Sequence, residues 1–303
     1  MRWSELRAEI LRVLREKTQA TDSDRNASYE ADEILFRIAG IGTEDRLLRN
    51  AEEAGADEVQ ACLSVAKKRS EGEPLAYLLR EVSFFGDDYF ICPGCLIPRA
   101  DTEVLVEEIL SALPYGGTLL DLCTGSGCVP CAVLRNRSDA RAFAVEQYSE
   151  PLKTAFENRR RLSLESRLTI CRGDVLQGMV PDNCCPDLIC ANPPYIPSPV
   201  CGTLDREVRM EPREALDGGE DGLLFYRAIL SQYEPVLPPD GCFRFEIGFD
   251  QADALRDISS SFGFECTVRQ DYAGRDRVVR LKRVDSRTRT ESCNERRTAV
   301  EKG

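Results

Sequence analysis

Residues 186–195 read PDLICANPPY, an apolar run that ends in a polar, proline-rich segment. The run Pro186 to Ala191 predicts a buried strand. Two consecutive prolines follow Asn192, and because proline cannot donate a backbone hydrogen bond, the strand must end there. The prolines also stiffen the backbone, which would fix the directions of the Asn192 amide and the Tyr195 ring. A lone Pro-Pro after a strand is more often a simple turn, so a reactive site here needs support from elsewhere in the chain.

That support begins with the strand predicted at residues 118–123 (TLLDLC). It runs into Thr124-Gly125-Ser126-Gly127 and then into a predicted helix. A strand, a glycine-rich turn and a helix let the backbone approach a ligand closely. The turn has neither the GxGxxG spacing of a dinucleotide site nor the GK[ST] of a P-loop.

Two further predicted strands also end in acids. Residues 141–145 lead into Glu146, and residues 168–173 lead into Asp174. An acid after the second strand is placed to accept hydrogen bonds from a ribose diol. Ligands of open α/β sheets bind at the carboxyl ends of the strands, so four polar strand ends in order indicate one site at that edge.

The rest of the chain divides by pattern. Residues 1 to about 80 predict a small helical bundle, since apolar residues recur there at helical spacing. Val82 to Ile91, interrupted by Gly86-Asp87-Asp88, predicts a β-hairpin. The strands predicted at 264–270 and 277–282 should pair antiparallel. The polar, charged residues from about 285 onward predict disorder.

The net charge and the composition exclude several classes of function. The net charge is −12 and the chain has no histidine. Because phosphate neutralisation dominates nucleic-acid affinity, such an acidic chain is a poor generic DNA binder. The lack of histidine excludes Ser-His and Cys-His catalysis. No apolar run is long enough to span a membrane and no signal-peptide core is present, so we expect a cytosolic protein.

The 14 cysteines are scattered, and several lie in strand-like runs. In a cytosolic protein such residues are small, buried and reduced. The alternative is a zinc site. Two pairs, Cys92/Cys95 and Cys128/Cys131, have the CxxC spacing of zinc ligands. The first pair flanks Pro-Gly, the second begins a predicted helix, and no histidine completes either set. We therefore expect no metal.

A series of motifs resembles one enzyme family. In chain order they read GEPLAYLL, FFGDDYFICPGCLIPRADTE, DLCTGSG, NPPYI, EPREALDGGEDGL and AGRDRVV, between Gly72 and Val279. The first turn, the acid after strand two and the NPPY after strand four resemble class I S-adenosylmethionine-dependent methyltransferases that modify amide or exocyclic amine nitrogens. The full set is similar to the peptide chain release factor N(5)-glutamine methyltransferases, the HemK family.

The resemblance implies a domain order and an activity. Residues 1–80 would be a helical bundle that docks the release factor, 81–95 a β-hairpin linker, 96–284 the methyltransferase domain and 285–303 a disordered tail. The methyltransferase domain would be a Rossmann-like α/β fold with a seven-stranded sheet whose last strand is antiparallel. The implied reaction moves a methyl group from S-adenosylmethionine to the side-chain amide nitrogen of the GGQ glutamine in class 1 release factors.

The resemblance also implies site residues. S-adenosylmethionine would be bound by Cys123, Thr124, Gly125, Ser126, Gly127, Glu146, Asp174, Val175 and Asn192. The glutamine would be bound by Asn192, Pro193, Pro194, Tyr195 and Phe90, with Asn192, Pro193 and Tyr195 as the catalytic set. The Asn192 side-chain oxygen and the Pro193 carbonyl would accept hydrogen bonds from the substrate NH2.

Three positions depart from the family pattern. Cys123 replaces the first glycine of DLGTGSG, Glu146 stands for the usual aspartate, and Val175 stands where an aromatic residue is common. These changes bear on cofactor affinity, whereas the NPPY segment is intact.

Other interpretations stay open. An NPPY enzyme acting on a ribosomal-protein glutamine would share the chemistry and the cofactor site. One acting on adenine in nucleic acid would need a basic footprint, against which the charge of −12 argues. Cys123 and Val175 favour a third possibility, a catalytically idle module that binds a translation factor. We expect a release factor as partner, no direct nucleic-acid or membrane contact, and a monomer.

Overall fold

The computed structural model describes residues 1–16 and 23–284, so the disorder predicted for residues 285–303 lies outside the described residues. The described residues form two compact units. The N-terminal unit holds those within 1–82, 90–93 and 204–211, and the sheet unit holds the others. Each unit is described by itself below.

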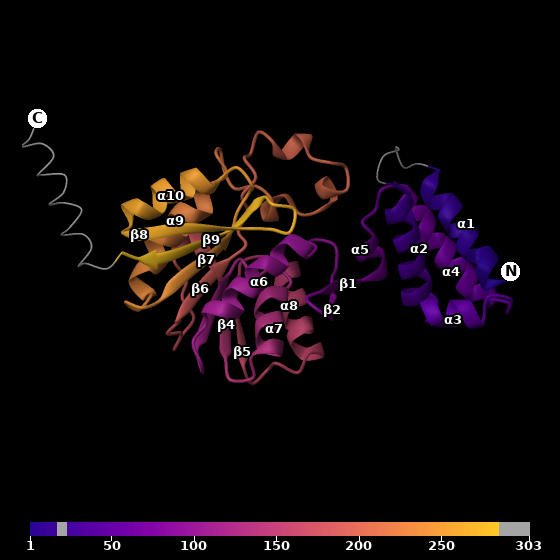
Figure 1. Cartoon of the computed structure of the whole chain (residues 1–303), viewed down its shortest axis with the longest axis horizontal. Coiled ribbons are helices and arrows are strands. Elements are labelled where there is room, and N and C mark those ends of the chain that lie inside the picture. The colour runs from indigo at the N-terminus through magenta and orange to yellow at the C-terminus, as the bar shows by residue number, and fades with distance from the viewer. Residues whose placement is uncertain (17–22, 285–303) are drawn as a thin grey trace, which may run out of the picture. The chain divides into compact units, whose positions relative to one another are not determined.

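The N-terminal unit is helical, as predicted (Figure 1). On its first helix, residues three or four apart share a face, and this face carries Trp3, Leu6, Ile10 and Leu14 into the core. That core also contains Ile34, Leu35, Cys62 and Ala66 from the second and fourth helices. The helices are α1 Trp3–Arg15, α2 Ser23–Ala39, α3 Thr43–Leu48, α4 Ala56–Ser70 and α5 Leu75–Leu79.

A two-stranded hairpin follows, formed by β1 Glu81–Phe84 and β2 Asp87–Phe90. Its turn consists of Phe85 and Gly86, which have φ angles of 50° and 84°. Two successive positive φ values are the pattern of the tight turns that join twisted strands. The sequence placed the break at Gly86-Asp87-Asp88, one residue later, because aspartates are rare in strands. Both aspartates instead belong to β2.

The sheet unit contains seven strands in the order β5-β4-β3-β6-β7-β9-β8 (Figure 1). Strands β3 to β7 run parallel, and β9 runs antiparallel to both of its neighbours. The predicted fold class and the antiparallel pairing of the last two strands are confirmed. The strands are β3 Thr118–Leu122, β4 Arg141–Glu146, β5 Leu168–Arg172, β6 Leu188–Ala191, β7 Cys242–Glu246, β8 Phe264–Gln270 and β9 Asp276–Arg283.

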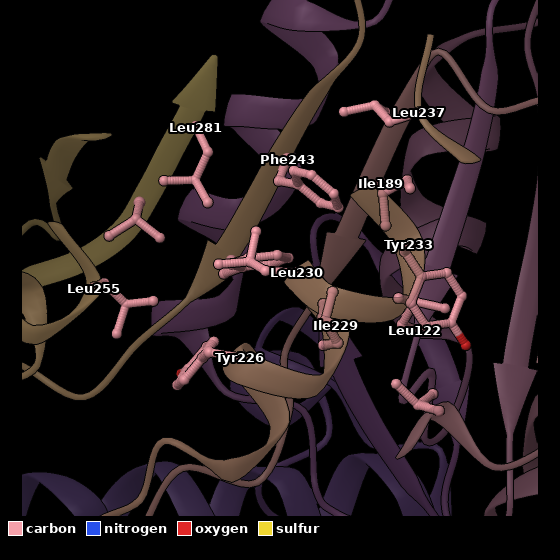
Figure 2. Close-up of a cluster of buried hydrophobic side chains, with 14 of the residues drawn as sticks. Leu122, Ile189, Tyr226, Ile229, Leu230, Tyr233, Leu237, Phe243, Leu255 and Leu281 are labelled. Atoms are coloured by element: carbon pink, nitrogen blue, oxygen red, sulfur yellow. The ribbon is translucent and has the colours of Figure 1, made fainter. Parts of the chain in front are cut away.

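Helices cover both faces of this sheet. Successive strand residues point to opposite faces, and on β7 Phe243 packs in a core with α9 and α10 (Figure 2). The next residue, Arg244, faces Glu108 of α6 on the other side. The α-helices are α6 Ala100–Ala112, α7 Cys128–Asn136, α8 Ser149–Arg161, α9 Leu224–Tyr233 and α10 Ala252–Ser261. The short 3-10 helices of this unit are η1 Val175–Gln177, η2 Cys201–Thr203, η4 Arg213–Ala215 and η5 Glu234–Val236, whereas η3 Val208–Met210 belongs to the N-terminal unit.

The core between the sheet and α9 fixes the central strands. Leu122, Ile189 and Phe243 come from three neighbouring strands, and Tyr226 and Leu230 meet them from α9 (Figure 2). Every residue of β6 and β7 is buried, as expected for central strands of a sheet covered on both faces. This packing holds the carboxyl ends of the parallel strands β3, β4, β5 and β6 together at one end of the sheet.

None of the helices in the described part of the chain combines the length and the apolar character that crossing a membrane requires.

Candidate active site

Two connected cavities lie at the carboxyl ends of the parallel strands. The larger has about 610 Å³ of space, part of it open to solvent, and its lining includes Cys123, Gly125, Glu146, Val175 and Asn192. The smaller has about 400 Å³, also partly open to solvent, and its lining includes Thr102, Asp121, Thr124, Ser126 and Asn192. Leu96, Cys123, Gly125 and Asn192 line both. The structure thus brings most of the predicted residues together, with Asn192 where the two cavities join.

The turn after β3 owes its shape to three residues with positive φ. Cys123, Gly125 and Gly127 have φ angles of 59°, 56° and 75°. Only glycine adopts this conformation without steric cost, so Cys123 is a strained residue where the family pattern has glycine. A side chain at Gly127 would also place its Cβ 3.2 Å from the Cβ of Ala155 in α8. Gly127 therefore sets the packing of the turn on α8, and it is absent from the lining of both cavities.

The Glu146 carboxylate ties the turn to the next strand. Its two oxygens accept backbone hydrogen bonds from Gly125 and Tyr148, each at 2.9 Å. Burial raises the pKa of Glu146, against the lowering effect of these bonds. A carboxylate has about four lone-pair sites, so both oxygens keep acceptor capacity toward the cavity.

A second acid, Asp121, lies deeper beneath the smaller cavity. It is 2% exposed and accepts hydrogen bonds from the Thr124 hydroxyl and, at 3.1 Å, from the Cys190 thiol. Burial raises its pKa to about 7, although both hydrogen bonds act in the opposite direction. Burial also raises the pKa of the Cys123 thiol, so at neutral pH that side chain is a neutral thiol.

The Asn192-Pro193-Pro194-Tyr195 segment is held on several sides. The Asn192 side-chain nitrogen donates to the Thr102 hydroxyl at 3.3 Å. Because the NH2 end of the Asn192 amide makes this bond, the other end, the side-chain oxygen, is the atom that can accept a hydrogen bond. Both prolines are buried, and Pro194 lines the larger cavity. The Tyr195 hydroxyl lies 3.5 Å from a Glu246 oxygen.

Two glycines that the sequence analysis did not single out allow this segment to approach the chain at residues 216–222. A Cβ on Gly218 would lie 2.7 Å from the Pro194 carbonyl oxygen, and one on Gly222 would lie 2.3 Å from the Tyr195 carbonyl oxygen. That Tyr195 oxygen accepts a hydrogen bond from the Gln251 side chain at 2.9 Å. The glycines lie in the EPREALDGGEDGL motif, whose glycine spacing is the signal that could have found them.

Glu246 is a second group that the sequence analysis missed. It ends β7, it is 1% exposed, and its Oε2 atom has no hydrogen-bond partner among the described residues. Burial raises its pKa to about 7, whereas the hydrogen bond from Thr102 and the charge of Arg277 lower it. An acid inside the run CFRFEI, whose only other charged residue is Arg244, is the sequence signal for such a group.

Besides Gly127, the predicted residues Pro193, Tyr195, Asp174 and Phe90 are absent from the lining of both cavities. The Asp174 carboxylate accepts bonds from the Leu176 backbone and the Gln177 side chain, both at 2.9 Å, and it is absent from the lining of both cavities. Phe90 ends β2, is half-buried and belongs to the N-terminal unit. Their roles in binding stay predictions. No cluster of three or more potential metal ligands occurs within residues 1–16 and 23–284.

Comparison with known proteins identifies the family. No protein-family model matches the chain. A release factor glutamine methyltransferase of Geobacter sulfurreducens is 37% identical over 84% of this chain and 89% of its own length. One from Moorella thermoacetica is 39% identical over 81% and 88%. A methyltransferase structure from Pyrococcus furiosus shares the fold, with a TM-score of 0.51, 17% identity and coverage of 67% of this chain and 92% of that one. The chain belongs to the release factor glutamine methyltransferase family.

Proposed function

We propose that the protein is a cytosolic enzyme that transfers a methyl group from S-adenosylmethionine to the side-chain amide nitrogen of the GGQ glutamine in class 1 release factors. The observation that carries the proposal is the position of Asn192, which lines both cavities and whose side-chain nitrogen is hydrogen-bonded to Thr102. Family membership supports the same reaction, since the relatives are named release factor glutamine methyltransferases.

The two cavities fit the two halves of the methyl donor. The larger has apolar walls, including Val175 and Phe225, for the adenine ring, and it carries the Glu146 carboxylate for the ribose hydroxyls. The smaller has polar lining from Thr124 and Ser126, which suits the amino-acid half. S-adenosylmethionine supplies an electrophilic methyl group on a sulfonium sulfur. Val175 offers the adenine ring a smaller contact than the planar face of an aromatic side chain would.

The chain's contribution to the chemistry is positioning. An amide nitrogen is a poor nucleophile because its lone pair is delocalised into the carbonyl. The Asn192 oxygen and the Pro193 carbonyl accept hydrogen bonds from the substrate NH2 and direct the nitrogen at the methyl group. Positive charge develops on that nitrogen in the transition state, so both bonds strengthen there more than in the ground state.

No side chain is required as a base before methyl transfer. The methylated nitrogen is acidic, and its proton can leave to water afterwards. Burial, with the nearby Glu246 charge, raises the pKa of Tyr195, so its phenol stays protonated. Tyr195 lines neither cavity, so its proposed part is indirect, as a support for the segment that carries Asn192.

The N-terminal unit is the proposed docking element for the release factor. Tyr29 and Phe36 lie two turns apart on α2, with 62% and 48% of their surface exposed. Replacing both with serine should raise KM for the intact release factor. The same variant should leave kcat for a short GGQ peptide unchanged, because the peptide has no surface for the docking element.

The function is tested with purified protein and labelled S-adenosylmethionine. A wild-type class 1 release factor should gain label, and the same factor with its GGQ glutamine changed to alanine should gain none. Equal labelling of both factors would contradict the proposed acceptor. Failure to bind S-adenosylmethionine in calorimetry would support the idle-module alternative.

A further inference from the structure

The side chain of Gln251 connects three points of the chain beside the proposed acceptor site. It is 8% exposed, and its amide nitrogen donates hydrogen bonds to the Tyr195 carbonyl at 2.9 Å and to the Gly222 carbonyl at 3.2 Å. Its amide oxygen accepts a hydrogen bond from the Gly248 backbone N–H at 2.9 Å. Tyr195 and Gly222 lie near the two ends of the connection between β6 and α9, and Gly248 lies between β7 and α10. One amide therefore ties the two ends of the first connection to each other and to the second connection.

The three partners fix the direction of this amide. Two of them are carbonyl oxygens, which can only accept hydrogen bonds, and the third is an N–H group, which can only donate one. If the amide turned over, its oxygen would face two carbonyl oxygens and its NH2 would face the N–H group. The position therefore requires a side chain that donates twice at one end and accepts at the other. Neither an ionised carboxylate nor an apolar side chain meets this requirement.

The backbone of Gln251 gives this side chain a fixed base. Gln251 is the residue that precedes α10. Its N–H donates to the Gly248 carbonyl at 3.1 Å, and its own carbonyl accepts a hydrogen bond from the N–H of Leu255 in α10 at 3.0 Å. Leu255 is fully buried in the core that Figure 2 shows. The helix that follows Gln251 is therefore anchored by the core of the sheet unit.

The two prolines limit how the segment beside Gln251 can be held. Pro193 and Pro194 have no backbone N–H to donate, so they can be held only through their carbonyls and through packing. Their rings also fix their φ angles, so a displacement of Tyr195 is passed along the segment to Asn192. The Asn192 oxygen and the Pro193 carbonyl are the two groups proposed to bind the substrate NH2. The bond from Gln251 to the Tyr195 carbonyl therefore bears on the position of both.

We propose that Gln251 is a positioning residue, which sets the Asn192 oxygen and the Pro193 carbonyl for methyl transfer by holding the Tyr195 carbonyl. The inference rests on the proposed function, because it concerns the placement of the groups that bind the glutamine. Gln251 is absent from the lining of both cavities, so it acts through Tyr195 and not by contact with the reactants. Glycine at position 222 leaves room for this amide, since a Cβ on Gly222 would lie 2.8 Å from the Gln251 nitrogen.

The first test compares two substitutions of Gln251. Gln251→Met has a similar size but removes all three hydrogen bonds, whereas an ionised Gln251→Glu keeps an acceptor for the Gly248 N–H and loses both donors. The variants are assayed at about pH 9, so that the introduced carboxyl is ionised. In each variant kcat for a class 1 release factor should fall about tenfold to a hundredfold, because a misplacement of about 1 Å near the reacting atoms can cost about a hundredfold. Kd for S-adenosylmethionine in calorimetry should stay near the wild-type value.

Thr154→Val is the matched control. Thr154 is a fully buried threonine on α8 whose hydroxyl donates to the Glu150 carbonyl at 2.9 Å, and it lines neither cavity. This variant also loses a buried hydrogen bond to a backbone carbonyl, so its stability should fall while its kcat stays unchanged. Urea unfolding gives the folded fraction of each variant, and kcat is expressed per folded molecule.

A double-mutant cycle separates positioning from a general loosening of the fold. Gly222→Ala displaces the same Tyr195 carbonyl, so the bond that Gln251→Met removes is already weakened in that variant. The fall in kcat for the double variant Gln251→Met/Gly222→Ala should therefore be smaller than the product of the two single falls. Two substitutions that act independently would give the full product.

Several results would overturn the proposal. They are wild-type kcat in Gln251→Met or Gln251→Glu, an equal fall of kcat in Thr154→Val, and single losses that multiply in full in the double variant. If the wild type itself fails to methylate a release factor, the proposed function fails and this inference fails with it. An active wild type beside a fully active Gln251→Met leaves the proposed function standing and removes this inference alone, so the two failures are distinguishable.

Discussion

Substitution of Gly222 by alanine tests how tightly the Asn192–Tyr195 segment is held. A Cβ at this position would lie 2.3 Å from the Tyr195 carbonyl oxygen and 2.8 Å from the Gln251 side-chain nitrogen, whereas ordinary contact begins near 3.4 Å. The Tyr195 carbonyl must therefore move by about 1 Å or lose its 2.9 Å bond from Gln251. Gly222 also has φ of +74°, which alanine adopts only with strain.

The expected cost has two parts. The left-handed conformation costs a residue with a Cβ about 1 kcal/mol, and an unsatisfied buried carbonyl costs about 1–3 kcal/mol more. Gly222→Ala should thus lose about 2–4 kcal/mol of unfolding free energy. A misplacement of about 1 Å near the reacting atoms can cost about a hundredfold in rate, so kcat should also fall by at least about tenfold.

Gly274→Ala is the matched control. Gly274 has nearly the same φ, +78°, but a Cβ there would meet nothing within 4 Å. The Gly274→Ala variant should lose only about 1 kcal/mol of unfolding free energy, the cost of the left-handed conformation, and its kcat should be unchanged. Urea unfolding and steady-state methyl transfer measure both quantities. If Gly222→Ala and Gly274→Ala lose the same stability and keep the same kcat, the reasoning about the close approach is wrong.

Further predictions concern the cavities. Asn192→Ala should reduce methyl transfer below detection while Kd for S-adenosylmethionine in calorimetry stays near wild type; near-normal turnover would refute its assigned role. Glu146→Ala should raise that Kd about tenfold or more through loss of hydrogen bonds to a charged group, and an unchanged Kd would count against the ribose contact. Cys123→Gly should raise the unfolding free energy by about 1 kcal/mol, because glycine relieves the positive φ of 59°; a less stable variant would show that the thiol packing outweighs the strain. Asp121 has a pKa raised to about 7 by burial, so its contribution to stability is full below its unfolded pKa and is lost as the pH rises through about 7. Unfolding measured from about pH 5 to about pH 8 should therefore decline less steeply in Asp121→Asn than in the wild type.

The sequence predicts the sheet well because its strands are defined locally. Apolar runs such as residues 118–122 and 188–191 are followed within three residues by glycine or proline, and these residues stop a strand through their own backbone chemistry. Element ends without such signals are less certain. The sequence pattern predicts a helix from Glu103 to Leu113, whereas α6 begins three residues earlier, at Ala100, and the preceding Arg99 offers no side-chain cap.

The site is predictable only in part, for a related reason. Asn192 and Glu146 follow strands in the chain, so their place at the carboxyl edge follows from the fold class. Thr102 and Glu246 reach the same place through contacts across 90 and 51 residues of sequence. No local pattern encodes those separations, and only the packed sheet brings the groups together.

The most direct test of the central claim is a crystal structure of the protein with S-adenosylhomocysteine and a GGQ peptide. The account predicts the nucleoside in the cavity lined by Glu146 and Val175, with the glutamine nitrogen within hydrogen-bond distance of the Asn192 oxygen. A glutamine bound elsewhere, or facing the Asn192 nitrogen, would contradict it.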